Sequence, residues 1–184
     1  AVSGVRGPYV LAVGTLEPRK NLITTIAAME VLADSGLDIP LVVAGGRGWR
    51  DSELTRRMSQ SRARVIPVGR VSDEDLVALY GGSTCLVFPS LYEGFGLPVL
   101  EAMACGAPVI AANTTSTPEV VGDAGVLVDP TDAEGIAEAI RSIAEASDIA
   151  ADLQARGLAR AAEFTWDRTT DLTVQVYEMA LDAT

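Results

Sequence analysis

The 184-residue chain contains no histidine. Without an imidazole, neither a Ser-His-Asp nor a Cys-His catalytic set can be assembled from this chain alone. The two cysteines, Cys85 and Cys105, lie in apolar contexts and lack the paired spacing of a metal site. That context is typical of small buried thiols, so the chemistry must come from other residue types.

Long hydrophobic runs are also missing. The longest apolar runs are strand-sized, well short of the roughly 20 residues that a membrane-spanning helix needs. The N-terminal segment has no basic start followed by an apolar stretch, so it does not have the pattern of a signal peptide. The chain does not begin with Met, and we expect it to be a piece of a longer protein. Its length suits one globular domain.

Positive charge is scarce, with 14 Lys and Arg against 25 Asp and Glu, a formal net charge of −11. A field of that sign repels phosphate backbones, which argues against nucleic-acid binding. Any anionic ligand must therefore be held by a local arrangement of donors and cations. No G-x-G-x-x-G fingerprint follows the first strand and no G-x-x-x-x-G-K-[ST] loop is present, which disfavours a plain NAD or ATP site.

What the chain does have is a regular alternation of short apolar runs and helical patterns. Strands are expected at 9–14, 41–46, 64–69, 84–90, 108–113 and 125–129. Helices are expected at 21–36, from about 51, at 73–80, from Pro98 to a stop at Gly106, from 117, at 132–147, at 148–163, and from 165 nearly to the C-terminus. Continuous apolar strands that alternate with helices indicate a parallel sheet covered on both faces, a three-layer α/β/α domain with six strands.

Helix caps support these boundaries. Asn21, Ser72 and Thr165 are suitable N-cap residues for the helices that follow them. Thr117 with Pro118 is typical of an N-cap followed by a proline at the first helical position.

Four unusual segments follow four successive strands, and they occupy residues 14–20, 45–49, 69–75 and 90–96. In a parallel sheet, ligands bind outside the carboxyl ends of the strands. We therefore expect these segments to face a single crevice.

The first of these segments, "GTLEPRK", places Arg19 and Lys20 after a strand and directly before a helix. Two cations beside free helix N–H groups can bind a pyrophosphate. The same residues are also compatible with a solvated pair of cations on a loop, and the sequence alone leaves both interpretations open.

The stretch "LYEGFGLPVLEAMACG" carries two carboxylates, Glu93 and Glu101, on either side of a glycine-rich turn. Glu101 falls in what we expect to be the first turn of a helix, where an acid stabilises the helix dipole. Alternatively, both carboxylates point into the crevice, where Glu101 can accept hydrogen bonds from a vicinal diol. Gly94 and Gly96 allow close approach of the backbone, so that amides there can donate to hydroxyls or phosphate.

Three stretches, "VGTLEPRKNL", "FPSLYEGFGLPVLEAMACGAPVIAAN" and "PEVVGDAGVLVDP", resemble the C-terminal, donor-binding domain of retaining nucleotide-sugar glycosyltransferases. That family is glycosyltransferase group 1 (family 4), and its GT-B fold has two Rossmann-like halves. The similarity covers essentially the whole chain. Its E-x7-E motif stands here as Glu93 and Glu101.

The resemblance implies a role for each matching residue. Lys20, helped by Arg19, would hold the donor diphosphate, and Glu93 would contact the donor sugar near the reacting centre, so these three are the catalytic candidates. Glu101 would accept from the ribose hydroxyls. The remaining donor-binding candidates are Gly14, Thr15, Arg70 and Val71, the last two near the base, and the amides of Gly94, Phe95, Gly96 and Leu97.

One departure from the family pattern concerns the phosphate site. Many members have Arg directly after the first-strand Gly, whereas Gly14 is followed here by Thr15. Arg19 is the candidate to replace that charge.

The resemblance also implies what the whole protein does. Residues 1–184 would form the donor-binding half, and an N-terminal acceptor domain, absent from this chain, would complete the enzyme, so the isolated domain is expected to be inactive. The expected reaction moves a sugar from a UDP- or GDP-sugar, mannose-type by similarity of "GTLEPRKNL", to an acceptor in glycan, cell-envelope or glycolipid synthesis. It retains anomeric configuration and needs no metal or other cofactor.

Two alternatives are a non-catalytic nucleotide-sugar binding module and a GT-B epimerase relative. The expected location is the bacterial cytoplasm, or the inner face of the cytoplasmic membrane through the missing domain.

Overall fold

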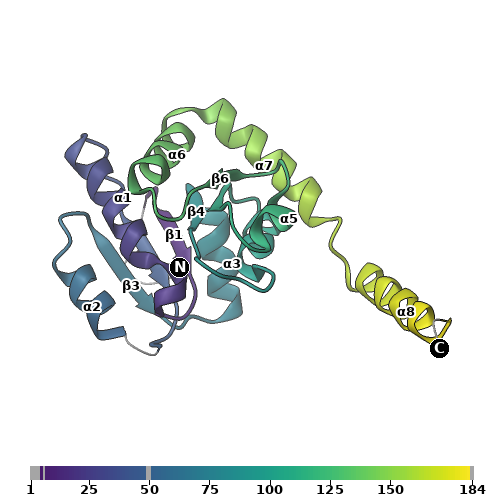
Figure 1. Ribbon diagram of the computed structural model, residues 1–184. Helices are drawn as coiled ribbons and strands as arrows, with labels where there is room; N and C mark the ends of the chain where they lie inside the picture. The colour runs from purple at the N-terminus through teal and green to yellow at the C-terminus, as the bar shows by residue number, and fades with distance from the viewer. Residues whose placement is uncertain (1–4, 6, 49–50, 183–184) are drawn as a thin grey trace.

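A six-stranded parallel sheet forms the centre of the molecule, in the order β3-β2-β1-β4-β5-β6 (Figure 1). The computed structural model describes residue 5, residues 7–48 and residues 51–182. The strands are β1 (Val10–Val13), β2 (Leu41–Ala44), β3 (Val65–Gly69), β4 (Cys85–Phe88), β5 (Val109–Ala112) and β6 (Val126–Val128). The predicted Rossmann-like, three-layer fold with six parallel strands is confirmed.

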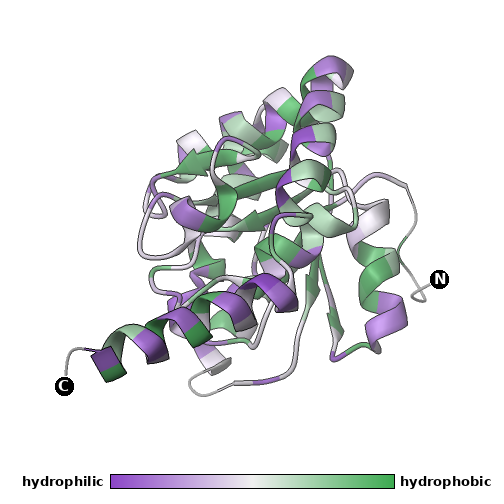
Figure 2. Cartoon of the chain, turned by 90° about the vertical axis from the view of Figure 1, so that its right-hand side faces the viewer, coloured by the Kyte–Doolittle hydropathy of each residue, from purple (hydrophilic) through white to green (hydrophobic). Residues whose placement is uncertain are grey.

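Successive side chains of each central strand enter two different hydrophobic clusters. In β1, Val10 and Ala12 belong to one cluster and Leu11 to the other. In β4, Val87 and Leu86 divide in the same way. Because side chains alternate between the faces of a sheet, strands buried on both faces have continuous apolar sequences. Figure 2 shows these strands as hydrophobic inside a shell of mixed helices.

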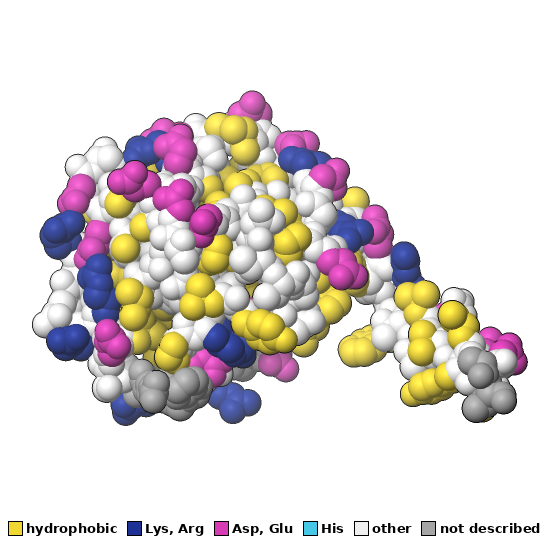
Figure 3. All heavy atoms as spheres, in the orientation of Figure 1, with side chains coloured by type: hydrophobic (Ala, Val, Ile, Leu, Met, Phe, Trp, Pro, Cys, Tyr) yellow, Lys and Arg dark blue, Asp and Glu magenta, His cyan; other side chains and the backbone are white. Residues whose placement is uncertain are grey.

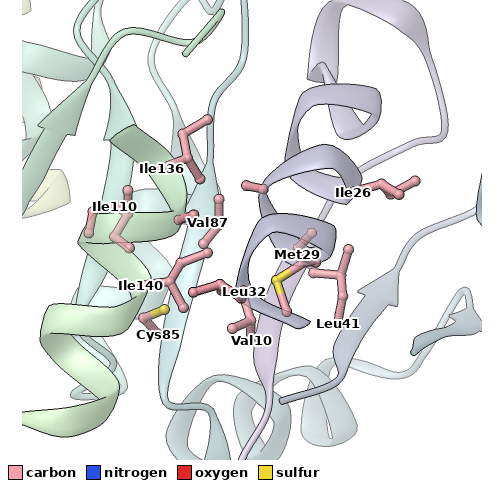
Figure 4. Close-up of a cluster of buried hydrophobic side chains, with 14 of the residues drawn as sticks. Val10, Ile26, Met29, Leu32, Leu41, Cys85, Val87, Ile110, Ile136 and Ile140 are labelled. Atoms are coloured by element: carbon pink, nitrogen blue, oxygen red, sulfur yellow. The ribbon is translucent and has the colours of Figure 1, made fainter. Parts of the chain in front are cut away.

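Helices cover both faces of the sheet. The helical elements are η1 (Pro18–Lys20), α1 (Leu22–Asp34), α2 (Asp51–Ser59), α3 (Asp73–Gly82), α4 (Leu97–Ala104), α5 (Thr117–Val121), α6 (Ala133–Glu145), α7 (Ser147–Ala161) and α8 (Trp166–Asp182). Side chains of α1, α2 and α6 fill one cluster, and those of α3, α4 and α5 fill the other. Figure 4 shows Leu32 of α1 beside Ile140 of α6, with both helices on the same face of the sheet.

Two of the four expected side-chain caps form. Ser72 accepts a hydrogen bond from the Asp75 amide, and Thr165 accepts one from the Arg168 amide. The prediction that Thr117 caps α5 is wrong, because Ser116 is the N-cap and Thr117 is the first helical residue. The Thr117 hydroxyl instead donates backward to the carbonyl oxygens that precede it. Pro98 lies one position later in α4 than expected, because the helix begins at Leu97.

The last helix, α8, extends away from the body (Figure 1). All of its described side chains are exposed, including Trp166 at 84%. Hydrophobic side chains gather on this helix in Figure 3. Among the described residues, no helix combines the length and the apolar character needed to cross a membrane.

The strand order reverses between β1 and β4: α1, which follows β1, covers one face of the sheet, and α4, which follows β4, covers the other. Such a switch point leaves a crevice outside the carboxyl ends of the strands. The expected segments 14–20, 45–48, 69–75 and 90–96 lie at this edge, while Trp49 lies outside the described residues. The exits of β1 and β2 are joined by the Gly14 amide, which donates to Ala44 O at 2.9 Å.

The closeness of these two exits makes Gly45 a sensitive position. A Cβ atom on Gly45 would lie 1.9 Å from the Gly14 carbonyl oxygen, whereas one on the adjacent Gly46 would meet nothing within 4 Å. Two backbone segments must separate to admit the methyl group, and forced overpacking of this kind costs about 1–3 kcal/mol.

We predict that Gly45→Ala lowers the free energy of unfolding by about 1–3 kcal/mol, as measured by urea denaturation. Gly46→Ala is the matched control and should stay within about 0.5 kcal/mol of the parent chain. Equal losses in the two variants would contradict the close approach of the β1 and β2 exits.

Candidate functional site

An ion pair joins the two sides of the switch point. Lys20 ends η1 after β1, and Glu93 lies in the loop after β4. The Lys20 Nζ donates to Glu93 Oε1 at 2.7 Å, and both side chains are only 9% exposed. The same Nζ lies 4.6 Å from the centroid of the Phe88 ring. The structure therefore brings two of the predicted catalytic residues into direct contact.

Arg19, the third of the predicted catalytic residues, adds a second cation to the same carboxylate. Its Nη1 lies 3.0 Å from Glu93 Oε2 and also donates to the Tyr92 carbonyl oxygen at 3.2 Å. Its Nε pairs with Glu17 at 2.5 Å. Its side chain is 45% exposed, so Arg19 can meet a ligand from solvent. This geometry excludes a pair of cations that is merely solvated on a loop.

The surroundings of Glu93 change its acidity. Burial alone would raise the pKa of Glu93, but the Lys20 hydrogen bond and the charges of Lys20 and Arg19 more than offset that effect. The result is a pKa below the ordinary value of 4.5. The nearby Ser90 hydroxyl also favours the carboxylate, although no directed hydrogen bond joins the two groups.

Asn21 fixes the loop that carries the two cations. Its backbone is left-handed (φ 54°), a conformation that Asn tolerates better than most residues. Its Nδ2 donates to Pro89 O at 3.2 Å and to Pro130 O at 2.6 Å, so the side chain bridges the exits of β4 and β6. Asn21 occupies the predicted N-cap position but makes no side-chain cap bond. The bridging role of Asn21 was not predicted from the sequence.

A hollow of about 450 Å³ lies beside the ion pair, over the exits of β1, β2 and β3. Gly14, Thr15, Arg70 and Val71, four of the predicted donor-binding residues, line it. The Lys20 side chain packs against Gly14, since a Cβ there would lie 3.0 Å from Lys20 Cε. The hollow and the cations are therefore neighbours. Its volume is within the range of small-ligand sites.

Glu101 is not among the residues that line the hollow, but it contacts α3, which borders the hollow. The Tyr80 hydroxyl donates to Glu101 Oε2 at 2.9 Å, and Leu76, one turn before Tyr80 on α3, lines the hollow. Burial, then the Glu101 charge, raises the pKa of Tyr80, so this hydroxyl stays a donor. The expectation that Glu101 occupies the first turn of its helix is wrong. It is the fifth residue of α4, and the first turn, all of it described, has no acid.

The loop before α4 offers main-chain donors. Gly96 caps the helix in the left-handed conformation (φ 101°), which favours glycine. Among the described residues, no protein acceptor receives a hydrogen bond from the amides of Gly94, Phe95, Gly96 or Leu97. The Phe95 ring turns toward Phe164, edge to face at 5.9 Å between centroids. Gly94, Phe95 and Leu97 are exposed, whereas Gly96 is buried, so three of the four predicted amide positions lie at the surface.

A parallel sheet of this order, with its polar crevice at the switch point, defines a Rossmann-like domain. The chain belongs to the group 1 glycosyltransferases, because residues 3–160 match the family model described as "Glycosyl transferases group 1".

Several curated relatives share this domain. The chain is 41% identical over 174 residues to the O-antigen chain mannosyltransferase B of Escherichia coli, covering 93% of this chain and 46% of the relative. It is 35% identical to the serotype-specific mannosyltransferase WbdA of Escherichia coli, covering 95% of this chain and 22% of that protein. The chain therefore spans about half or less of the length of these relatives.

Solved structures show the same fold. Sucrose-phosphate synthase from Thermosynechococcus elongatus superposes with a TM-score of 0.81 at 32% identity, over 96% of this chain and 46% of that one. The C-terminal domain of a glycosyl transferase group 1 family protein, LpcC, from Francisella tularensis gives 0.74 at 27% identity, over 84% of this chain and 85% of that one. The predicted family and its GT-B-type half-fold are confirmed.

The ion pair at the site should make the stability depend on pH. Because the folded state lowers the pKa of Glu93, its contribution to stability is present above pH 4.5 and is lost as the pH falls through the folded pKa. We predict that Glu93→Gln costs about 1–3 kcal/mol at pH 7, since Lys20 then lacks its charged partner. The difference from the parent chain should shrink below pH 4.5 in urea titrations at successive pH values.

Glu138→Gln, at an exposed position of α6, is the control and should change stability little at any pH. A cost for Glu93→Gln that is the same at pH 3 and pH 7 would refute the ion pair as its source.

Proposed function

We propose that this domain is the donor-binding half of a retaining glycosyltransferase that takes a nucleoside-diphosphate sugar as its donor. The observation that carries the proposal is the meeting of Lys20, Arg19 and Glu93 at the switch point, beside a hollow large enough for a nucleoside. Membership of the group 1 glycosyltransferases supports it.

In the proposed complex, the diphosphate binds Lys20 and Arg19. A protein with a net charge of −11 has little general attraction for anions, so these local cations must supply it. When no ligand is bound, Glu93 pairs with both cations and Glu17 pairs with Arg19, so two carboxylates balance two positive charges. A bound diphosphate takes over the cations, and Glu93 then accepts from a hydroxyl of the donor sugar. The amides of residues 94–97 donate to the sugar hydroxyls and the phosphate.

The nucleoside occupies the hollow in this proposal. The base lies near Arg70 and Val71, and the ribose diol binds Glu101. The Tyr80 hydrogen bond supports this role, because it fixes one oxygen of Glu101 and leaves the carboxylate accessible.

Cleavage of the sugar–phosphate bond gives the leaving diphosphate extra negative charge. Cations aimed at it stabilise the transition state more than the ground state, which is the condition for catalysis. At about 4 Å and an effective dielectric constant near 20, one charge pair supplies at most about 4 kcal/mol. If about half of this acted only in the transition state, the rate would rise more than tenfold. We propose a metal-free reaction on this basis.

The names of the relatives support a choice of sugar and acceptor. Because the relatives above 30% identity include an O-antigen chain mannosyltransferase and a serotype-specific mannosyltransferase, we propose a mannose-type donor and an acceptor in a cell-envelope glycan. The acceptor would bind a further domain, since the chain covers less than half of those proteins.

Calorimetry with UDP, GDP, ADP and their sugars tests the donor class. Absence of binding to every member of this panel would overturn the proposal.

The role of Lys20 can be tested with Lys20→Met, which keeps an aliphatic stem against Gly14 and removes the ammonium group. We predict that the variant binds the preferred nucleoside diphosphate about 10- to 100-fold more weakly, the worth of a charge-assisted hydrogen bond. Binding of the free nucleoside should change less than about twofold, because no phosphate is present. Arg62→Met, on a surface loop, is the control; equal losses for both ligands would remove Lys20 from the phosphate site.

The role of Glu101 can be tested with Glu101→Gln, which keeps an acceptor for Tyr80. We predict about tenfold weaker binding of the nucleoside diphosphate, with an unchanged melting temperature, because one charged acceptor for the ribose is lost. A 2′,3′-dideoxy nucleotide should bind the variant and the parent chain equally. A lowered melting temperature without a change in affinity would make Glu101 a structural residue.

A further inference from the structure

Four consecutive hydroxyl residues, Thr114 to Thr117, follow β5 and lie against the loop that carries Glu93. Two of them bond the main chain of Glu93 on both sides. The Glu93 amide donates to Thr115 Oγ1 at 3.2 Å, and Ser116 Oγ donates to the Glu93 carbonyl oxygen at 3.1 Å. The backbone position of Glu93 is therefore set by side chains from another loop.

The other two hydroxyl residues anchor this loop. The Thr117 hydroxyl shares its one proton between Ala112 O at 2.6 Å and Thr114 O at 2.7 Å, which ties the loop to the end of β5. Thr114 Oγ1 donates to Ser90 O at 3.5 Å, at the exit of β4. Since β4 and β5 are hydrogen-bonded neighbours in the sheet, the loop is held on a rigid support.

Thr115 adopts a strained conformation to make its contact. Its φ of 55° is in the left-handed region, which is costly for a β-branched residue. Such strain persists where the surrounding structure determines it, and it clusters at functional sites. Glycine would remove the strain but would also remove the oxygen that accepts from Glu93. A threonine is therefore useful at this strained position because its hydroxyl oxygen accepts from the Glu93 amide.

We propose that Thr115 and Ser116 are positioning residues, which hold the Glu93 backbone so that its carboxylate lies against the cations and faces the donor sugar. The part of this inference that concerns the donor sugar rests on the proposed function. The part that concerns the position of the Glu93 carboxylate against the cations does not. Neither residue need touch the donor. Each acts through Glu93, so removing either hydroxyl should weaken binding of the sugar part of the donor and leave binding of the nucleotide part unchanged.

The test uses three variants and one control. Thr115→Val removes the hydroxyl but keeps a β-branched side chain in the same strained backbone. Ser116→Ala removes the second hydrogen bond, and Thr115→Ser restores the first and should rescue function. Thr173→Val is the control, because the Thr173 hydroxyl bonds only the Thr169 carbonyl within exposed α8.

The first readout is the gain in affinity that the sugar adds, measured by calorimetry as the ratio of the dissociation constants for GDP and GDP-mannose, and for UDP and UDP-glucose. We expect Thr115→Val and Ser116→Ala each to reduce this ratio about fivefold, the effect of one hydrogen bond. Affinity for the free diphosphates should stay within about twofold, because Lys20 and Arg19 are untouched.

The second readout is the pKa of the Glu93 carboxyl, followed by NMR titration. It should rise toward 4.5 in Thr115→Val and Ser116→Ala, because the carboxylate is held less closely against Lys20 and Arg19, the charged groups that face it. A lowered melting temperature with both readouts unchanged would overturn the proposal. If no nucleotide binds the parent chain, the proposed function fails, and the pKa measurement still decides the role of Thr115 and Ser116.

Discussion

The ion pair between Lys20 and Glu93 is the interaction on which the site depends. The two residues are 73 positions apart in sequence and meet only because β1 and β4 are neighbours at the switch point. Both side chains are almost fully buried, and either charge alone would be costly to bury without its partner. The pair therefore joins the exits of the two strands. It also fixes Lys20 beside the hollow, against Gly14, so the geometry of the crevice follows from it.

The sequence predicted the layers of this fold well because they depend on local patterns. Strands buried on both faces have continuous apolar sequences, and β1, β2, β4 and β5 all lie within the expected ranges. Ser72 and Thr165 capped as expected, since a cap needs only the next three residues. The convergence of segments at one edge was predictable from the same rule, because parallel strands place their carboxyl ends together.

The parts that were missed depend on contacts between distant segments. Asn21 suits an N-cap locally, but its Oδ1 accepts from the Thr24 hydroxyl, and its Nδ2 donates to distant carbonyls. Thr117 was expected to cap its helix, and the end of β5 takes its hydroxyl instead. No local pattern shows that Thr115 supports Glu93. The start of α4 at Leu97 was not predicted, because the glycine-rich turn before it carries no polar N-cap residue. Glu101 lies beyond the first turn of α4, so it does not stabilise the positive end of the helix dipole.

The self-neutralised site also gives a physical account of selectivity in the proposed function. An anion that takes Lys20 and Arg19 leaves the Glu93 carboxylate beside its own charge, and at about 4 Å with an effective dielectric constant near 20 that repulsion reaches about 4 kcal/mol. A bare phosphate has nothing to offer Glu93 in return. A diphosphate joined to a sugar brings hydroxyl donors to the same place, which compensate the carboxylate while the cations hold the phosphate. The acid beside the cations thus favours the whole donor over its anionic fragment, and it does so only while the loop holds Glu93 in place.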